Sequence, residues 1–571
     1  MGAFPLSPSV QSPRAYDLAN LSGAQITSRL TRTGLGGVLY AQDTAESAVP
    51  VVPFDIFIPN YTAAGEQRPN RLVRNTTPGV TDMTAAINNA MLVAANGGYK
   101  KVRLHDGETY LVSSQLTIPC DGLILEGYAK IICASTADYE FVLYALNRTG
   151  VQIRYVEFDL NQSARAGIQT HRFHGPFLSG CTDSILETVK VRNTLGYGGI
   201  SAVGIAIGQG TRIAVQNCHL IDCGTASLTS DAVYTSGTQN VIAGTTATNC
   251  TDTAFVIEDS DYSGISGCTA INCGAIAAID VSLATDRYGN FISGLTGKNW
   301  DAASTGGIQI GTLASTGNLR DTNITGVNMY ADTAGGFGHG AAIWIRRVGT
   351  GIANVVKMAD INVNGGTYAL RVDDATSVSC SDWDIKNCSS SGMLFLGGTG
   401  HKVKDVDITG GAVGLDVQNA ASVSARHVFT SSTTSVGMQA LNTSTLTLID
   451  SDVLSVSSGV RLAKDAGATL NYGPTNRNIV VNSAGTYTVL SSDHTIIQTT
   501  AASVYTLLDP TLYKGKTITI KTEFAGTITS ASANVVPLVG GSAATAILAA
   551  TAGKFAVLQS DGVSWRVIEA N

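Results

Sequence analysis

The sequence predicts an all-β chain, a right-handed single-stranded parallel β-helix with a short N-terminal lead-in, a capping helix and a small C-terminal β domain. Two observations predict it. An Asn-Cys pair recurs at Asn249-Cys250, Asn272-Cys273 and Asn387-Cys388, and the first two pairs are 23 residues apart. Short segments of alternating apolar and polar residues follow the pairs, and hardly any window between about 100 and 470 has helical periodicity. A period of roughly 20–50 residues is typical of stacked repeats.

The first two elements are a lead-in and a helix. Residues 1–70 are irregular and contain many of the prolines, which predicts an extended lead-in segment and no compact domain. A helix is expected over about 82–96, where apolar residues recur at helical spacing. Thr81 or Asp82 can cap its first turn, and Gly97-Gly98 ends it because glycine takes the left-handed position without penalty.

The body of the β-helix is expected over 71–473. The inward side chains of each coil pack on the coils above and below. The recurrent Asn is expected to hydrogen-bond to its copy in the next coil, and the Cys to point into the bore. The alternating segments that carry this interpretation are Phe255–Ile257, Ile279–Val281, Ile308–Ile310, Ile343–Ile345, Leu370–Val372, Leu394–Leu396, Leu415–Val417 and Val460–Leu462.

A different β pattern occupies 474–571. Alternating segments begin near Asn478 and end with 555–558 and 565–568, and Asp561-Gly562 between the last two is a hairpin signal. We expect a small β domain that either trimerises the chain or binds carbohydrate.

The composition excludes several classes of protein. Charged residues make up 14% and apolar residues 44%, so the chain is not disordered. The net charge of −7 and the lack of any long Lys/Arg run argue against nucleic-acid binding. No secretory signal is visible in Met1–Tyr16, and no segment predicts membrane insertion. The ten Cys are expected to be reduced and buried, and we expect no metal and no cofactor.

One motif resembles that of a known family. Gly79–Ile87, followed by Gly97-Gly98 and Thr109–Val112, is similar to the entry motif of pectate-lyase-like β-helix proteins, with Met83 in place of the motif's second Asp. The layout of the whole chain resembles bacteriophage tailspikes, the capsular polysaccharide depolymerases of phages. The resemblance implies a homotrimer that assembles in the bacterial host cytoplasm and sits on the virion tail through its N-terminal segment. It also implies binding, and usually cleavage, of a capsular or lipopolysaccharide glycan.

Hydrolysis of a glycosidic bond needs two carboxyl groups. Outward side chains at the same position of adjacent coils are separated by about 4.8 Å. If Phe255 and Ile257 point inward, Glu258 points outward, and Asp280 lies one coil later. We therefore predict Glu258 and Asp280 as the catalytic pair, with Asp231 one coil earlier as the reserve partner. The alternative is that these carboxylates are solvated or structural.

Several side chains are predicted to bind the substrate. Trp344 alternates with Ile343 and Ile345, so it faces away from the bore, and Arg346 and Arg371 continue the same face. A flat aromatic face can stack on a sugar ring, and Arg can bind carboxylate or hydroxyl groups. Packing against a neighbouring subunit is the other interpretation of this face. The predicted substrate-binding set also contains Asp286, Tyr288, Trp300 and His174.

The amino-acid sequence leaves three functions open. The first is a hydrolase with the carboxylate pair. The second is a polysaccharide lyase that acts by β-elimination, for which His174 and Tyr197 are possible bases. The third is a receptor-binding spike that holds a glycan without cutting it. A secreted pectinase-like enzyme is disfavoured by the missing signal, and an esterase by the lack of a Gly-x-Ser-x-Gly turn.

Overall fold

The computed structural model describes residues 39–40, 56–58, 79–80, 82–96, 100–165, 170–198, 200–300, 306–331, 340–349, 353–454, 456, 460–472, 478–491 and 493–571. Most of the expected lead-in segment therefore lies outside the described residues, apart from strands β1 (Leu39–Tyr40) and β2 (Ile56–Ile58). The chain divides into two compact units, Met1–Gly274 and Ala275–Asn571.

The first unit opens with the capping helix α2 (Thr84–Asn96), which confirms the predicted helix. Its start is fixed by Asp82, whose Oδ1 accepts a hydrogen bond from the Thr84 amide at 3.0 Å. Ile87 and Met91 on its apolar face are fully buried. The helix therefore covers the open end of the first coils, as the 3.6-residue spacing of its apolar residues predicts.

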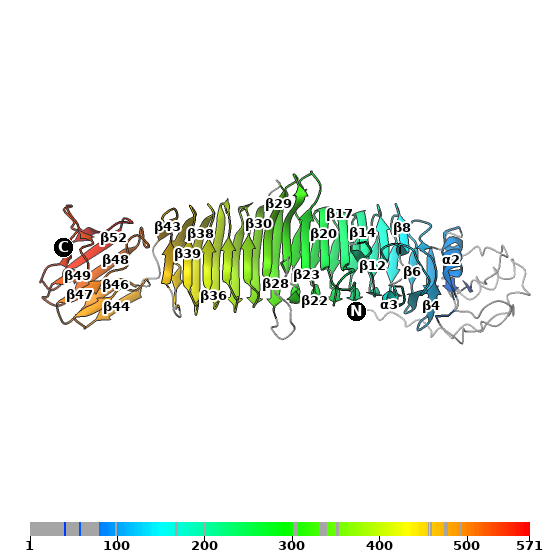
Figure 1. Cartoon of the computed structure of the whole chain (residues 1–571), viewed down its shortest axis with the longest axis horizontal. Helices are drawn as coiled ribbons and strands as arrows, with labels where there is room; N and C mark the ends of the chain where they lie inside the picture. The colour runs from blue at the N-terminus through cyan, green and yellow to red at the C-terminus, as the bar shows by residue number, and fades with distance from the viewer. Residues whose placement is uncertain are drawn as a thin grey trace, which may run out of the picture. The chain divides into compact units, whose positions relative to one another are not determined.

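Every coil of the first unit contributes one strand to a parallel sheet that we call wall B. Consecutive strands of this wall pair in parallel, and Figure 1 shows β8, β14, β17 and β20 following one another. The strands of wall B are β5 (Leu116–Thr117), β8 (Phe141–Leu146), β11 (His174–Ser179), β14 (Ala202–Thr211), β17 (Ser230–Thr238) and β20 (Thr253–Asp261).

The remaining strands of the first unit's coils form wall A, which is also parallel. Between its strands lies one short helix, α3 (Gln162–Arg165). The strands of wall A are β3 (Lys101–Leu104), β4 (Thr109–Val112), β6 (Ile124–Glu126), β7 (Lys130–Cys133), β9 (Gln152–Arg154), β10 (Glu157–Asp159), β12 (Ile185–Glu187), β13 (Lys190–Arg192), β15 (Ala214–Gln216), β16 (His219–Ile221), β18 (Val241–Ala243), β19 (Thr246–Thr248), β21 (Gly264–Ser266) and β22 (Thr269–Cys273).

In the recurrent Asn-Cys pairs, the Asn occupies a left-handed turn position and the Cys is buried. Asn249 and Asn272 have φ angles of 56° and 55°, a left-handed conformation that Asn tolerates better than most residues. The Asn272 Nδ2 donates to the Asn249 Oδ1 at 3.2 Å, so the predicted ladder is confirmed. Cys250 and Cys273, one residue later, are buried and free, as predicted.

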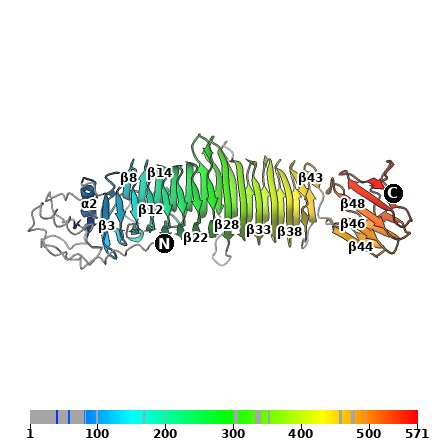
Figure 2. The same ribbon diagram turned by 180° about the vertical axis from the view of Figure 1, so that it is seen from behind.

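The second unit continues with the same two kinds of wall. Its wall B is a parallel series, and several strands of its wall A are long, as Figure 2 shows for β28, β33 and β38. Wall B comprises β23 (Ala275–Val281), β27 (Ile308–Ser315), β29 (Ala341–Gly349), β31 (Tyr368–Val372), β34 (Ser391–Phe395), β37 (Val413–Val417), β39 (Val436–Ala440) and β42 (Val460–Lys464). Wall A comprises β24 (Arg287–Tyr288), β25 (Phe291–Ser293), β26 (Thr296–Trp300), β28 (Leu319–Tyr330), β30 (Ala353–Asn364), β32 (Ala375–Thr376), β33 (Ser379–Lys386), β35 (Gly398–Thr399), β36 (His401–Thr409), β38 (Ser422–Ser431), β40 (Thr445–Ile449), β41 (Asp452–Val453) and β43 (Thr469–Tyr472).

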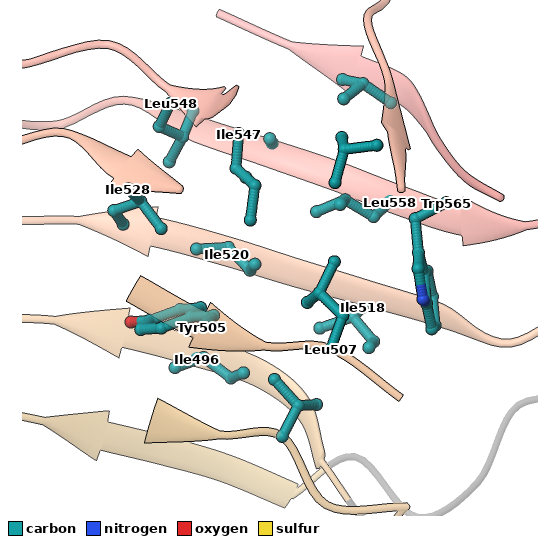
Figure 3. Packing of buried hydrophobic residues seen from close by; sticks show 14 residues of the cluster. Ile496, Tyr505, Leu507, Ile518, Ile520, Ile528, Ile547, Leu548, Leu558 and Trp565 are labelled. Atoms are coloured by element: carbon teal, nitrogen blue, oxygen red, sulfur yellow. The ribbon is translucent and has the colours of Figure 1, made fainter. Parts of the chain in front are cut away.

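A separate hydrophobic core organises the C-terminal strands. Ile518, Ile520 and Leu558 are fully buried around Trp565 (Figure 3). The predicted hairpin is confirmed, because β52 and β53 pair antiparallel across Asp561-Gly562. The strands are β44 (Asn478–Asn482), β45 (Thr486–Thr488), β46 (Asp493–Gln498), β47 (Ser503–Thr506), β48 (Thr517–Thr522), β49 (Ile528–Ser530), β50 (Val535–Val536), β51 (Ala546–Leu548), β52 (Phe555–Ser560) and β53 (Trp565–Ala570).

Candidate active site

Three acidic side chains of the first unit lie near one another on or directly before strands of wall B. Asp231 lies near the start of β17, Asp252 directly precedes β20, and Glu258 lies on β20. Phe255 and Ile257 are buried in the bore, so the alternation of the strand turns Glu258 outward, as predicted. We call Asp231, Asp252 and Glu258 the acidic cluster.

The environment of Asp231 favours its protonated form. Its Oδ1 accepts a hydrogen bond from the Thr253 amide at 3.0 Å, which fixes the carboxyl group. Burial, followed by the nearby charge of Asp252 and a smaller contribution from Glu258, raises the pKa of Asp231 well above its ordinary value, against the opposing effect of the Thr253 amide. A carboxyl group that keeps its proton in this way can act as a general acid.

A tyrosine of the neighbouring strand lies beside Glu258. Burial, followed by the nearby charge of the Glu258 carboxylate, raises the pKa of Tyr234. The phenol therefore keeps its proton and is a potential hydrogen-bond donor to Glu258.

Asp252 and its partner were not identified from the sequence. The Ser201 hydroxyl donates to the Asp252 Oδ2, and it also lies 2.8 Å from the Thr229 hydroxyl. These residues lie at the starts of three successive wall B strands, outside the alternating segments that the sequence search followed. A search that also compared the residues preceding each strand would have found Asp252 beside Asp231.

A small polar pocket adjoins the acidic cluster. It has a volume of about 180 Å³, and Ile200 in its wall is followed directly by Ser201, the residue that binds Asp252. Ligand pockets usually measure about 300–1,000 Å³, so this pocket is large enough for only part of a glycan. Its lining residues are Glu140, Thr170, His171, Arg172, Tyr197 and Ile200.

His174 was predicted to bind substrate, and this prediction is wrong. The side chain is 5% exposed and stacks on Phe141, with ring centroids 5.3 Å apart. Burial, and to a smaller extent the charge of Arg172, lowers its pKa to about 3. A neutral, enclosed imidazole of such low basicity is unsuited both to contact with a surface polysaccharide and to proton abstraction. Tyr197, in contrast, is exposed and lines the pocket.

Asp280, the predicted partner of Glu258, belongs to the second unit, so the pairing of the two carboxylates stays a prediction. Within its own unit, Asp280 on β23 lies in register with Gly311 on β27 and Arg346 on β29. Because Gly311 has no side chain, Arg346 can reach past it, and its guanidinium Nη2 lies 3.5 Å from the Asp280 Oδ2. Both side chains are largely buried.

Trp344 and Arg371 occupy the next outward row of wall B. Both donate to Asp373, Trp344 from Nε1 at 2.8 Å and Arg371 from Nε at 2.9 Å. The Arg371 guanidinium also lies 4.7 Å from the centre of the Trp344 ring. The predicted outward face therefore exists, and Asp373 holds it in a single geometry.

The other predicted substrate-binding residues are placed differently. Trp300 is fully buried in the bore, so its assignment to the surface is wrong; its aromatic volume fills the core of a coil. Asp286 accepts hydrogen bonds from the Asn318 amide and from Arg320, which fixes a turn to the next coil. Tyr288 is partly exposed and contacts Asp286 at 3.5 Å.

Within the described residues, no group of His, Cys, Asp or Glu could hold a metal ion. The helices of the described part are all too short or too polar to cross a membrane.

Comparison with known proteins finds distant structural likenesses. No family model and no curated protein matches this chain. The tailspike protein of E. coli bacteriophage HK620, solved with a pentasaccharide, matches 68% of this chain and 78% of its own at 12% identity and a TM-score of 0.44. Endo-xylogalacturonan hydrolase from Aspergillus tubingensis matches 56% and 93% at 14% identity and a TM-score of 0.42. A Thermotoga maritima exopolygalacturonase matches 62% and 89% at 13% identity and a TM-score of 0.40. Likenesses this distant assign no activity to this chain.

Proposed function

We propose that this chain is a glycan depolymerase that hydrolyses glycosidic bonds in a bacterial capsule or lipopolysaccharide, as part of a phage tailspike. The observation that carries the proposal is the acidic cluster, in which burial and two neighbouring carboxylates raise the pKa of Asp231 well above its ordinary value. Glycoside hydrolysis requires one protonated and one ionised carboxyl group at the same bond.

In this mechanism Asp231 gives its proton to the leaving glycosidic oxygen. Glu258, which lies beside the Tyr234 hydroxyl, activates a water molecule or attacks the anomeric carbon. Asp252, anchored by Ser201, disfavours a negative charge at Asp231, so Asp231 takes up a proton from water again after each turnover. Asp280 is the alternative partner of Glu258, and its ion pair with Arg346 suits the same ionised role.

The experiment is a reducing-end assay on a panel of purified bacterial polysaccharides, with mass spectrometry of the products. Asp231→Asn, Glu258→Gln and Asp280→Asn are compared with Glu187→Gln, a wall A carboxylate that pairs with Arg154 at 3.2 Å. Loss of cleavage in Asp231→Asn and Glu258→Gln, with normal activity in Glu187→Gln, supports the proposal. Near-normal cleavage rates in both cluster variants would refute the proposal.

A polysaccharide lyase is the second candidate function, and the pocket beside the cluster favours it. Tyr197 is exposed there as a possible base, and Arg172 lines the same pocket, although it is paired with Glu140 at 3.0 Å. A lyase forms products one water lighter than those of a hydrolase. A Tyr197→Phe variant that loses activity while Asp231→Asn keeps it would identify this chemistry.

The assembly roles belong to the same proposal. Residues 1–70 would attach the chain to the phage tail, the chain would act as a homotrimer at the bacterial surface, and 474–571 would trimerise the body or bind sugar. Deletion of 474–571 tests the last role. A stable and active trimer from the shortened chain would contradict an assembly role for this region.

A further inference from the structure

A larger hollow lies on wall A of the second unit, where β33, β36 and β38 end. Its volume is about 420 Å³, which falls within the range of about 300–1,000 Å³ that is usual for ligand sites. We call it the wall A groove. Six of its lining residues carry the argument: Asp384, Lys386, Asp407, Thr409, Phe429 and Ser431.

Strand register arranges these six side chains as two parallel rows. Asp384 pairs with Asp407, which in turn pairs with Phe429. Two residues further along the same strands, Lys386 pairs with Thr409, which pairs with Ser431. Neighbouring positions in each row are separated by one strand spacing, about 4.8 Å. Since residues two apart in a strand share a face, both rows face the groove.

The polar groups of the groove are open to a ligand. The Asp407 carboxylate is exposed and has no side-chain partner among the residues that the structure describes. Asp384 is paired with Lys386, and the hydroxyls of Thr409 and Ser431 lie 3.2 Å apart. Phe429 is half-buried beside Asp407 and presents an apolar surface. Carboxylate acceptors, hydroxyls and an aromatic ring together suit a ligand with both hydroxyl groups and an apolar face.

We propose that the wall A groove is a second glycan-binding site, which holds a neutral saccharide without cleaving it. The saccharide hydroxyls donate to Asp384 and Asp407, and the apolar face of one sugar ring packs on Phe429. The two carboxylates face a single Lys386, so an anionic glycan is disfavoured. The Asp407 carboxylate is exposed and Asp384 forms an ion pair with Lys386, so the groove holds no enclosed carboxyl group that could serve as the acid of a cleavage reaction.

The proposal rests on the proposed function, because the polysaccharide that the first unit cleaves is the expected occupant. A glycan that is also bound outside the cleavage site keeps the enzyme on its substrate after each cleavage. The effective concentration of the next bond at the cluster then rises without any new contact there.

The test uses the full chain with Asp231→Asn, so that the glycan stays intact. Binding is measured by calorimetry with neutral and uronate-containing bacterial polysaccharides as probes. Asp407→Ala is the main variant, and Phe429→Leu, which keeps the apolar volume but removes the flat ring, is the second. Lys402→Ala is the control, since Lys402 is an exposed residue of the same strand, β36, outside the groove lining.

We expect each groove variant to weaken binding of a neutral polysaccharide about tenfold, a loss of about 1.4 kcal/mol, while Lys402→Ala stays within about twofold. Unchanged affinity in both groove variants would refute the groove as a binding site for a neutral glycan. Binding of uronate-containing glycans only, or no binding to any probe, would also refute it. If the parent chain cleaves a glycan and the groove variants bind normally, the proposed function is supported and the groove is refuted as a glycan site. If the groove variants bind weakly and the parent cleaves nothing, the groove is supported as a glycan site and the proposed function is refuted.

Discussion

Replacing Asp231 by Asn separates the chemistry of the acidic cluster from its architecture. The Asn side chain retains an Oδ1 that can accept the Thr253 amide hydrogen bond of 3.0 Å, so the local structure should persist. It cannot give a proton to a leaving oxygen. General acid catalysis contributes about 100- to 10,000-fold, which corresponds to about 2.7–5.4 kcal/mol of activation free energy. We expect the turnover rate of Asp231→Asn to fall by that factor.

The same substitution should raise the melting temperature at neutral pH. Because the pKa of Asp231 is higher in the folded than in the unfolded chain, the folded state binds more protons above the unfolded value. Its stabilising contribution is therefore present at low pH and lost as the pH rises through the folded pKa. Asn is neutral at all pH values and removes this loss. The activity of the parent chain should fall over the same rise in pH, since Asp231 then loses its proton.

The assay is turnover of a purified polysaccharide across pH, with thermal unfolding of the same samples. Glu187→Gln serves as the control for loss of an ordinary outward carboxylate. Asp231→Asn with normal turnover, or with both lower turnover and a lower melting temperature, would refute the reasoning. The first result would mean that Asp231 gives no proton, and the second that the carboxylate supports the fold.

Three further predictions concern other parts of the chain. Asn249→Ala should destabilise the β-helix by about 1–2 kcal/mol, because Ala tolerates the left-handed φ of 56° poorly. Asn249→Gly should destabilise it less. Equal melting temperatures of the Ala and Gly variants would contradict this prediction. Titration with a cleavable oligosaccharide should change the tryptophan fluorescence, and Trp344→Phe should abolish the change; an unchanged signal would argue against a sugar at Trp344. Burial lowers the pKa of Lys516 to about 8, so unfolding of the C-terminal strands should become harder between pH 8 and about 10.5, by at most about 3 kcal/mol. Lys516→Met should lose this rise, which thermal melts at the two pH values would detect.

The β-helix could be predicted from the sequence because the two patterns that indicate it each lie within a few consecutive residues. The Asn of each Asn-Cys pair marks a turn with left-handed φ, and the alternating segments mark the strands that face the bore. The capping helix and the last hairpin were predictable for the same reason, since Asp82 and Asp561-Gly562 fix element ends within a few residues.

Only part of the candidate active site could be predicted from the sequence. Alternation correctly turned Glu258 and Trp344 outward, but alternation does not show which outward residues another segment covers. Trp300 fills the core and His174 is enclosed beside Phe141, and no alternating segment had placed either residue. Asp252 was missed because it precedes its strand, where no period applies.

The wall A groove was missed for a different reason. Asp384 and Asp407 occupy equivalent positions 23 residues apart, and register places them side by side. The sequence search kept only the stretch with the greatest number of carboxylates in three coils, and Asp384 and Asp407 lie outside that stretch. Register in a β-helix is set by the lengths of the turns, which vary from coil to coil, so the sequence alone did not show that the two rows face one hollow.

The central claim is that the acidic cluster hydrolyses a glycan, and mass spectrometry of the products tests it most directly. The measurement is made on a panel of purified capsules and lipopolysaccharides treated with the parent chain and with Asp231→Asn. We predict that the parent chain forms defined oligosaccharides with one water added per cut, and that Asp231→Asn does not form them. Products lighter by one water, or identical products from Asp231→Asn, would contradict it.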